Sequence, residues 1–491
     1  MITFQDFEEL FKQNAGDAIS KVINDWKSGE IYNTAVTADT YDRQKNNTIM
    51  TFIKQMFSVS GLKIQDFTAS NNKIASNFFR RLNVQRNTYS LGNGLKFKDD
   101  ATKAKFGEDF DNTMFWGGYY SLIHAVCFLY SIGGDTGYFK ATEFAPLWDE
   151  ETGVLRGGVR FWQIDADKPT FAVLYLKEGR QKFKKDKKGF EAVDADIVPY
   201  GVNVTSTEAT GVEDVQPFVY SDLPIVPLWG STLHQSTLIG LQSQIDSYDL
   251  IRSGFANDLT DVAQIYWILE NYGGVDDKEL ERFLDRLKLN HIAEMDTSGG
   301  GKLTPYSQDI PFQARQAYLQ HIRGEIYEGF GAFDTSAMSA APKTATEIES
   351  AYQPLDENAD DYEYQIISCV KSLAKIIGID PAKATPEFKR NRVANASEMV
   401  DMLVSLADTL DTETIIDHIP FITVDEKDKV MQRIQEKELS RIEDEYDQTD
   451  LDEDISSDGD IVDQISNMDT EYLQEFADEI ISMLEGLANE V

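Results

Sequence analysis

The fold is decided by residues 223–274, LPIVPLWGSTLHQSTLIGLQSQIDSYDLIRSGFANDLTDVAQIYWILENYGG. The stretch opens with prolines spaced as in an extended strand and then takes on the periodicity of a long amphipathic helix. One apolar stripe steps through this helix by three, four and seven residues: Leu238, Leu241, Ile245, Tyr248, Phe255, Leu259 and Val262. About 25 residues at about 1.5 Å each predict a rod roughly 35–40 Å long.

A small insert separates this rod from a second one. Residues 277–290 have helical periodicity, the segments around 291–295 and 302–306 have strand patterns, and a glycine-rich turn joins the two strands. A second long helix is predicted after Pro311. Its apolar face consists of Leu319, Ile322, Ile326 and Phe330.

The amino-terminal part, residues 1–110, has mainly helical periodicity. Apolar residues repeat at helical spacing in two groups, Phe4, Phe7, Leu10 and Phe11, and then Ile49, Phe52, Ile53 and Met56. A helix within residues 77–97 is expected to end at Gly92 and Gly94, because glycine commonly follows a helix.

Short β-branched and aromatic runs between residues 127 and 220 predict an antiparallel sheet. The dense basic run at 180–188 is interpreted as a solvated hairpin beside an edge strand, with nucleic-acid contact as the alternative. Residues 112–134 carry no charge and are long enough to span a bilayer. Because Asp111 and Asp135 flank them and positive anchors are missing, a buried helix leading into a buried strand is the better interpretation.

The carboxy-terminal part is expected to be helical around a flexible segment. Residues 329–343 are small and have no apolar periodicity, whereas a capping-box pattern at Thr344 and Glu347 opens a helical stretch to residue 378. Pro354 is expected to kink or break this helix at Gln353. The apolar stripe then resumes at Tyr362, Ile366, Cys369, Leu373 and Ile376.

Composition and motif searches point away from enzymes and metal proteins. The net charge of −38 argues against a sequence-specific DNA-binding protein, and Cys127 and Cys369 support neither a disulfide framework nor a zinc site. The SGGGKLT stretch (298–304) is no phosphate-binding loop, because Asp296 stands where glycine is needed and Leu303 replaces the magnesium-binding hydroxyl. The calcium-like residues 454–465 end at Ile465 and so lack the bidentate carboxylate. We predict no catalytic residue, metal site, cofactor or secretion signal.

Several short motifs resemble those of bacteriophage portal proteins, in the family found in long-tailed phages. They include Pro-Ile-Val-Pro at 224–227, Ile-Asp-Ser-Tyr-Asp at 245–249 and Asn-Asp-Leu at 257–259. A second group lies in residues 387–438, where Asp411-Thr-Glu-Thr departs slightly from the Ser-x-Glu-Thr of many relatives. The resemblance covers roughly residues 30–440.

This resemblance implies an α+β, mainly helical fold with the parts of a portal protein. They are a helical part of the wing (1–110), a β-rich wing (111–225), a first stem helix (226–265), an αβ clip (266–310), a second stem helix (311–330), a tunnel loop (329–343), a long kinked helix with a wing return (344–395), a helical crown (396–447), and an acidic linker with a C-terminal amphipathic helix (448–491). Beyond Arg441 the sequence has 18 Asp and Glu and no Lys or Arg, which is typical of such a linker.

The resemblance further implies a ring of twelve copies at one capsid vertex of the virion, assembled in the host cytoplasm. Double-stranded DNA would pass through it during packaging and ejection, with no role for a membrane. The other implied partners are the terminase large subunit, a head-completion or adaptor protein, and the major capsid and scaffolding proteins. An acidic scaffolding or adaptor protein and a phage enzyme with an unrecognised site are the alternatives.

The implied site residues fall into three groups. Those of the tunnel loop, expected to contact DNA, are Gly331, Phe333, Ser336, Met338, Pro342 and Lys343. Those of the stem are Ile245, Asp246, Tyr248, Arg252, Asn257, Arg315 and Arg323. Those of the clip, expected to meet the motor and adaptor, are Lys278, Arg282 and Lys288.

Overall fold

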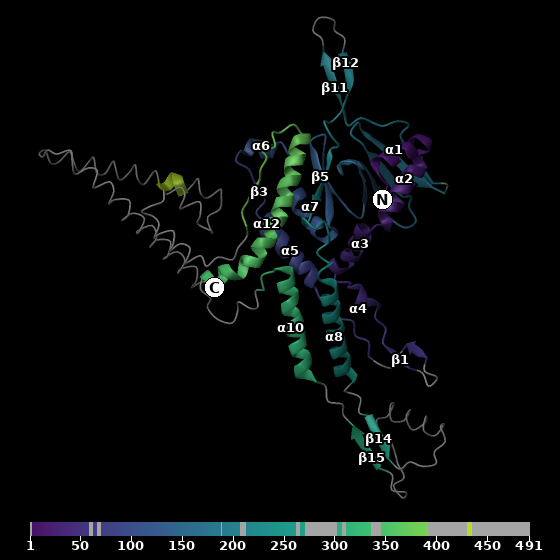
Figure 1. The fold of residues 1–491 in the computed structure, drawn as a ribbon, viewed down its shortest axis with the longest axis vertical. Helices are drawn as coiled ribbons and strands as arrows, with labels where there is room; N and C mark the ends of the chain where they lie inside the picture. The colour runs from purple at the N-terminus through teal and green to yellow at the C-terminus, as the bar shows by residue number, and fades with distance from the viewer. Residues whose placement is uncertain are drawn as a thin grey trace, which may run out of the picture. The chain divides into compact units, whose positions relative to one another are not determined.

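A computed structural model describes residues 2–57, 62–65, 70–187, 189–206, 213–261, 266–270, 302–306, 311–334, 345–390 and 430–434 (Figure 1). The chain divides into two compact units. The first comprises residues 1–337 and 352–391, and the second comprises 338–351 and 392–491. Helices and strands are both present, so the expected α+β class is confirmed.

Four helices open the first unit: α1 (Phe4–Gln13), α2 (Ala15–Ser28), α3 (Glu30–Asp42) and α4 (Asn47–Thr51). The predicted helix around Phe7 is confirmed as α1, and a capping box between Thr3 and Asp6 begins it. The helix expected to continue to Met56 is wrong, because α4 ends at Thr51. The chain then becomes extended, and β1 (Gln55–Phe57) pairs antiparallel with β2 (Lys63–Gln65).

The next helices build the centre of the unit. Helix α5 (Phe78–Leu91) ends at Gly92, as predicted. After β3 (Leu95–Lys96) and α6 (Asp100–Ala104), helix α7 (Phe110–His124) leads directly into β4 (Val126–Ile132). Most residues of α7 and β4 are buried, which confirms the interpretation of the uncharged stretch as a buried helix and strand.

The predicted antiparallel sheet is confirmed as two sheets and a hairpin. A five-stranded sheet has the order β10-β9-β8-β7-β6, and a three-stranded sheet has the order β13-β4-β5. The basic run lies on β9, directly beside the edge strand β10. The strands are β5 (Asp135–Lys140), β6 (Phe144–Trp148), β7 (Leu155–Trp162), β8 (Phe171–Tyr175), β9 (Arg180–Asp186), β10 (Gly189–Ala192), the hairpin β11 (Gly201–Ser206) and β12 (Glu213–Phe218), and β13 (Ile225–Trp229).

The remaining elements include both predicted rods. They are α8 (Gln242–Asp261), β14 (Tyr266–Glu270), β15 (Lys302–Tyr306), α10 (Phe312–Phe330), α12 (Ala345–Ile376) and β16 (Glu387–Phe388). Strands β14 and β15, which lie between the two rods in the sequence, pair antiparallel with each other. Strand β16 pairs antiparallel with β3. The 20 residues of α8 make a rod of about 30 Å, shorter than predicted. The predicted strand is confirmed at 225–229, but turns occupy residues 237–241, where the helix was expected to begin, and residues 262–265 lie outside the described ranges.

Pro354 was expected to kink or break helix α12 at Gln353, and of these two outcomes the structure excludes the break. The helix is not broken there, since Pro354 lies inside one element that runs from Ala345 to Ile376. The carbonyl oxygen of Pro354 accepts a hydrogen bond of 2.9 Å from the side-chain amide of Asn358. The predicted stripe further along the helix is buried at Tyr362, Ile366, Cys369 and Leu373.

Apolar clusters hold these elements together. One lies between helices α1 and α2 and the sheet strands, and a second joins α7, β4, β13 and α12. A third, which includes Ile245, Ile322 and Ile326, joins α8 and α10 to α3, α5 and α7. The two cysteines are buried and unbonded to each other, and burial raises the pKa of both thiols.

Candidate functional site

Helix α8 lies between two other parts of the chain. On one face it contacts residues 43–77, which we call the strap and which include α4, β1 and β2; residues 58–61 and 66–69 of the strap lie outside the described ranges. On another face it packs against α10. Figure 1 shows α10, α8 and the β1 end of the strap in that order.

Three polar side chains of α8 attach the strap in a regular series. The backbone N–H of Ser76 donates to Asp249 at 2.8 Å, that of Ile74 to Ser253 at 3.0 Å, and that of Asn72 to Asn257 at 2.6 Å. All three acceptor residues are buried. They lie four residues apart on the helix, and the donors lie two residues apart on an extended chain, so we call this series the polar ladder. It satisfies backbone donors that a purely apolar helix face would leave unpaired.

The other end of the strap is attached to the same helix. The side-chain amide of Asn46 donates to Asp249 at 2.5 Å, and the hydroxyl of Thr48 donates to Asp246 at 2.7 Å. The Tyr41 hydroxyl, just before the strap, also donates to Asp246, and burial together with this carboxylate raises the pKa of Tyr41 to about 12. Burial raises the pKa of the Asp249 carboxyl, and hydrogen bonds from Asn46 and Ser76 oppose that rise.

The contact between the two rods is partly apolar and partly ionic. Phe255 of α8 and Phe312 of α10 lie with ring centroids 5.4 Å apart. Arg315 of α10 also forms an ion pair with Asp258 of α8.

The predicted stem residues take different roles in the chain. Ile245 is buried in the core beneath both rods, and Tyr248 packs edge-on against Phe78 with centroids 4.9 Å apart. Arg323 pairs with Asp334 at 2.8 Å. Arg252 is exposed, so among these residues it is the cation that the chain presents most openly.

The start of the predicted tunnel loop is packed against the body of the unit. Phe333 is buried and stacks on Tyr352 with centroids 4.3 Å apart. Gly331 ends α10 in the left-handed conformation, with φ of 63°, and a Cβ there would lie 2.1 Å from the amide nitrogen of Asn358. Both residues therefore fix the end of α10. The predicted loop residues Ser336, Met338, Pro342 and Lys343 lie outside the described ranges, as do Lys278, Arg282 and Lys288 of the predicted clip.

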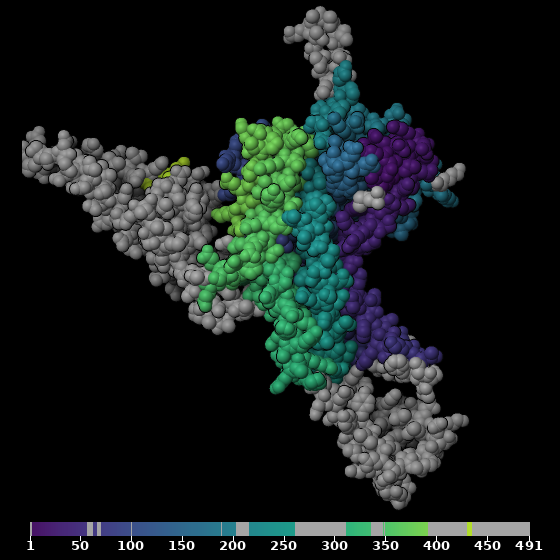
Figure 2. All heavy atoms as spheres, in the orientation of Figure 1, coloured from purple at the N-terminus to yellow at the C-terminus, as the bar shows by residue number. Residues whose placement is uncertain are grey.

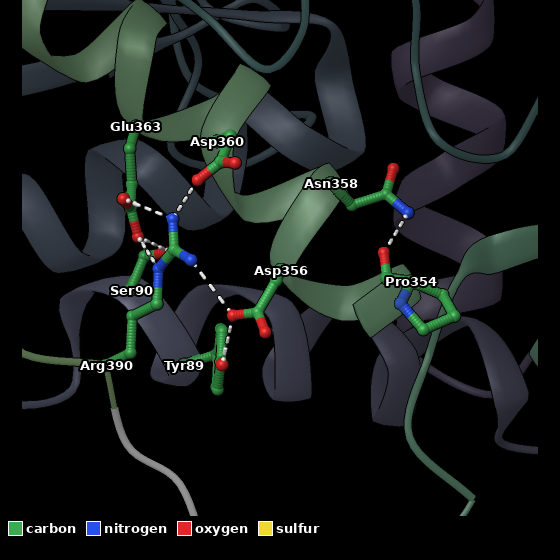
Figure 3. Close-up of polar contacts among 8 residues, drawn as sticks. All are labelled: Tyr89, Ser90, Pro354, Asp356, Asn358, Asp360, Glu363 and Arg390. Carbon is green, nitrogen blue, oxygen red and sulfur yellow. Dashed lines mark hydrogen bonds and ion pairs between the residues drawn. The ribbon is translucent and has the colours of Figure 1, made fainter. Parts of the chain in front are cut away.

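A second polar cluster fixes the chain where the first unit ends (Figure 3). Arg390 donates to Asp356 at 2.9 Å and to both carboxylate oxygens of Glu363 at 3.1 and 2.9 Å, and it also pairs with Asp360. Glu363 is buried and accepts a further hydrogen bond of 2.8 Å from Ser90 of α5. The bonds to Glu363 hold the pKa of the Arg390 guanidinium above its usual value. One arginine thus joins the segment after α12 to α12 and α5.

Sequence reasoning missed the roles of Asp249, Ser253 and Arg390. A signal for the first two was present, because polar residues at positions 249, 253 and 257 repeat at helical spacing inside a helix with apolar neighbours. For Arg390 the signal was weaker. Residues 345–363 contain seven Asp and Glu and no Lys or Arg, so a cation from elsewhere was to be expected beside that helix.

The described residues offer no arrangement suited to metal chemistry or to a membrane span. Within them, no group of three or more His, Cys, Asp or Glu side chains is placed to hold a metal ion. No helix in the described ranges is long and apolar enough to cross a membrane. His124 is buried beside Asp39 at 2.8 Å and belongs to the packing of α7 against α3.

The described part of the chain thus combines two paired helices, α8 and α10, with an antiparallel sheet region. Residues 37–450 match the model of the family described as phage portal protein, SPP1 Gp6-like. The chain therefore belongs to this portal family, which is a structural family of virion components and not an enzyme family.

Two curated relatives carry the name portal protein. The chain is 27% identical over 234 residues to that of Clostridium phage phiCD119, which covers 46% of this chain and 52% of the relative. It is 27% identical over 247 residues to that of Bacillus phage SPP1, which covers 48% of this chain and 46% of the relative. The matched region thus spans about half the length of each relative.

Proposed function

We propose that this chain forms the portal ring at one vertex of a phage capsid, through which double-stranded DNA is packaged and later ejected. The observation that carries the proposal is the family match across residues 37–450. The paired rods α8 and α10 support it, because two packed helices can form one segment of the wall of a channel when copies repeat around an axis. In this proposal they are the stem, the strands between residues 126 and 229 belong to the wing, and residues 396–447 form the crown.

The charge of the chain suits a channel that DNA slides through. At −38 per copy, a ring of twelve would carry −456. Phosphates are repelled by such a wall, and tight phosphate contacts would retard movement. Lys343, the only Lys or Arg in the proposed tunnel loop (329–343), would touch the passing DNA without holding it.

The proposed partners follow from the same assignment. The clip between the rods, residues 266–310, would meet the terminase large subunit during packaging and a head-completion or adaptor protein afterwards. Its described part is the pair of strands β14 and β15. The major capsid and scaffolding proteins would contact the ring during assembly in the host cytoplasm.

Negative-stain electron microscopy of the purified full-length protein tests the ring directly. We expect rings with a central hole at micromolar concentration. Particles that stay monomeric as the concentration is raised would overturn the proposal.

The DNA contact is tested separately with Lys343→Glu in capsids that package DNA. We expect intact rings but slower packaging or weaker retention of DNA, with the difference shrinking at high salt. Lys375→Glu, an equal change of charge at an exposed position of α12, is the matched control. If both variants fill and hold DNA like the parent, the loop is not the contact, and exposed stem residues such as Arg252 become the candidates.

A further inference from the structure

The basic run at residues 180–188 lies on an interior strand of the five-stranded sheet. Strand β9 pairs with β8 on one side and with β10 on the other. Lysines on an edge strand discourage pairing with another chain, but both edges of β9 are already paired. Protection of a sheet edge therefore does not account for the cations of this strand.

The lysines of β9 are exposed on both faces of the sheet. Phe183 is buried, and its ring centroid lies 6.4 Å from that of Phe11 in α1. Figure 2 shows α1 and α2 in purple beside the strands of this sheet in blue. Because side chains alternate along a strand, Lys185 shares the face of Phe183, whereas Lys182 and Lys184 lie on the opposite face. The end of β9 thus presents positive charge on both faces.

Two further lysines complete the group. Lys187 follows β9 in the turn to β10 and is exposed. Lys27 lies in the last turn of α2, with its amino group 4.9 Å from the centre of the Phe161 ring of β7. Partial burial lowers the pKa of Lys27, and the charge of Lys185 lowers it further, so these two amino groups lie near each other. We call Lys27, Lys182, Lys184, Lys185 and Lys187 the lysine cluster.

The amino groups of the lysine cluster are not neutralised by ion pairs. Within the described ranges none of the five forms one. The amino group of Lys182 lies 5.1 Å from the centre of the Phe171 ring, and that of Lys185 lies 5.9 Å from the centre of the Phe190 ring. A ring attracts a cation without neutralising its charge. The cluster therefore keeps its positive charge available to a ligand.

Three carboxylates adjoin the cluster and reduce its charge without removing it. Asp186 lies within β9, and Glu191 is opposite Lys184 in the register of the sheet. The carboxylate of Asp194 accepts the backbone N–H of Lys182 at 3.0 Å. Five cations beside three carboxylates leave a local net charge of +2 in a chain of −38. At physiological ionic strength the Debye length is about 8 Å, so acidic residues farther away weaken this local field little.

We propose that the lysine cluster binds the phosphates of duplex DNA. The choice of DNA rests on the proposed function, which brings this polyanion to the ring. The site goes beyond that function, because it lies on the sheet and not on the rods or in the tunnel loop. Lysines two residues apart on β9 are about 6.6 Å apart, and the phosphates of one DNA strand advance by about 3.4 Å, so each lysine can contact its own phosphate. Such contacts do not depend on base sequence.

An acidic protein segment is the less favoured ligand. Duplex DNA carries one negative charge for about every 1.7 Å of its axis. An extended polypeptide carries at most one for about every 3.3 Å. A cluster with a modest net charge gains more from the denser polyanion.

Fluorescence anisotropy with a short labelled duplex tests the proposal on the full-length protein, between about 50 and 200 mM salt. Lys182→Gln/Lys184→Gln is compared with Lys98→Gln/Lys105→Gln, the same change at exposed positions on either side of α6. Circular dichroism first checks that both variants are folded. We expect the first variant to bind at least about tenfold more weakly than the parent at about 50 mM salt. Its slope of log K against log salt should be smaller by about two, one for each lost phosphate contact, whereas the control keeps both values.

Removal of a competing carboxylate provides a test in the opposite direction. Glu191→Gln leaves Lys184 without the anion opposite it, so this variant should bind DNA about twofold more tightly than the parent. Lysines that serve only to keep the surface solvated would produce no such gain. Equal or weaker binding by this variant would overturn the proposal.

The remaining outcomes separate this inference from the proposed function. Equal binding of DNA by the parent and Lys182→Gln/Lys184→Gln would overturn it. Tighter binding of poly-L-glutamate than of the duplex would assign the cluster to an acidic protein partner and would also overturn it. Anisotropy needs no assembled ring. A parent that forms rings but shows no lysine-dependent binding therefore overturns this inference alone, and a parent that forms no rings overturns the proposed function.

Discussion

Asp249 shows how a carboxylate can serve as a structural acceptor in the interior of a helix contact. Its two oxygens accept from the backbone of Ser76 and from the side chain of Asn46, and the residue is buried. Burial opposes the charged form, whereas the two donors favour it. The side chain is therefore tied to the strap and is unsuited to contact with DNA.

Removal of this acceptor is expected to destabilise the first unit. Asp249→Ala leaves the Ser76 N–H without its acceptor and removes one of the two hydrogen bonds of the Asn46 amide, and a buried donor left unpaired costs about 1–3 kcal/mol. We expect the free energy of unfolding in urea to fall by about 2–4 kcal/mol. Ser243→Ala, at an exposed position of the same helix, should change it by less than about 0.5 kcal/mol. Equal effects of the two substitutions would show that the ladder contributes little.

The raised pKa of Asp249 also predicts a pH dependence. A carboxyl whose pKa is higher in the folded state contributes its full stability below the unfolded pKa, near 3.8, and loses that contribution as the pH rises through the folded value. Asp249→Asn cannot titrate. The stability of the parent relative to this variant should therefore decrease as the pH rises from about 4 to about 7, measured by urea unfolding. A relative stability that increases with pH would mean that the donors outweigh burial.

At the scale of elements, apolar periodicity predicted the helices well and their partners poorly. The stripe of α10 is buried at Ile322, Ile326 and Phe330, as expected. On α8 the stripe is buried at Leu238, Leu241 and Ile245 around the start of the helix, but Leu259 is 56% exposed. After Ile245 the buried face of α8 consists of Asp249, Ser253 and Asn257. It is polar because its partner is the backbone of the strap, whose N–H groups need acceptors. The periodicity of apolar residues predicts which side chains share a helix face. It cannot predict that a helix face contacts a backbone segment more than 170 residues away in sequence.

The same limit explains the error after α4. Ile49, Phe52, Ile53 and Met56 have helical spacing, yet only Ile49 is buried within a helix, and Phe52 and Ile53 are exposed. The spacing of apolar residues predicts which of them could share a helix face. It does not show whether another element of the chain packs against that face. The two rods of the candidate site could therefore be predicted from the sequence. The attachment of the strap to α8 and the contacts of Arg390 could be identified only in the structure.

The Arg390 cluster predicts how the segment after α12 is held. Arg390→Met removes the cation from buried Glu363, and loss of one partner of a buried pair is costly. We expect a loss of about 2 kcal/mol or more in the free energy of unfolding, together with faster amide hydrogen exchange in β16 and β3. Lys375→Met, at an exposed position of α12, is the control. Unchanged exchange in β16 would show that strand pairing alone holds the segment.

At the scale of the whole molecule, the first unit has its own core. The described apolar clusters of this unit include no residue beyond Phe388, and the next described residues after 390 are 430–434. A chain that ends after residue 391 should therefore keep the helical and sheet signal of this unit in circular dichroism. Its midpoint of thermal unfolding should stay within a few degrees of the parent's first transition.

A shorter truncation provides the control. A chain that ends at Gly378 also loses Ala384, β16 and Arg390, so its midpoint should fall clearly below that of the longer truncation. If the two truncated chains unfold alike, the segment after α12 adds nothing to the first unit.

The polar ladder has a length limit that follows from its two unequal repeats. Four residues of helix rise about 6.0 Å, whereas two residues of extended chain rise about 6.6 Å. The spacing of the donors on the strap therefore exceeds the spacing of the acceptors on α8 by about 0.6 Å at each step, or about 1.2 Å across the three rungs. With Ser253 and Ile74 in phase at the centre, the outer rungs stay within hydrogen-bonding reach, but two more rungs would double the drift.

The strap therefore has to diverge from α8 after a short run, whatever its sequence beyond Asn72. Deletion of Lys73 and Ile74 together would bring the N–H of Asn72 to Ser253 and keep the side chains before it on their present faces, whereas deletion of Lys73 alone would turn those side chains to the opposite face. The two-residue deletion should unfold at a higher urea concentration than the one-residue deletion, although it removes more of the chain; the reverse order would show that the rungs are not read in register. The geometry thus limits how far this segment can follow α8.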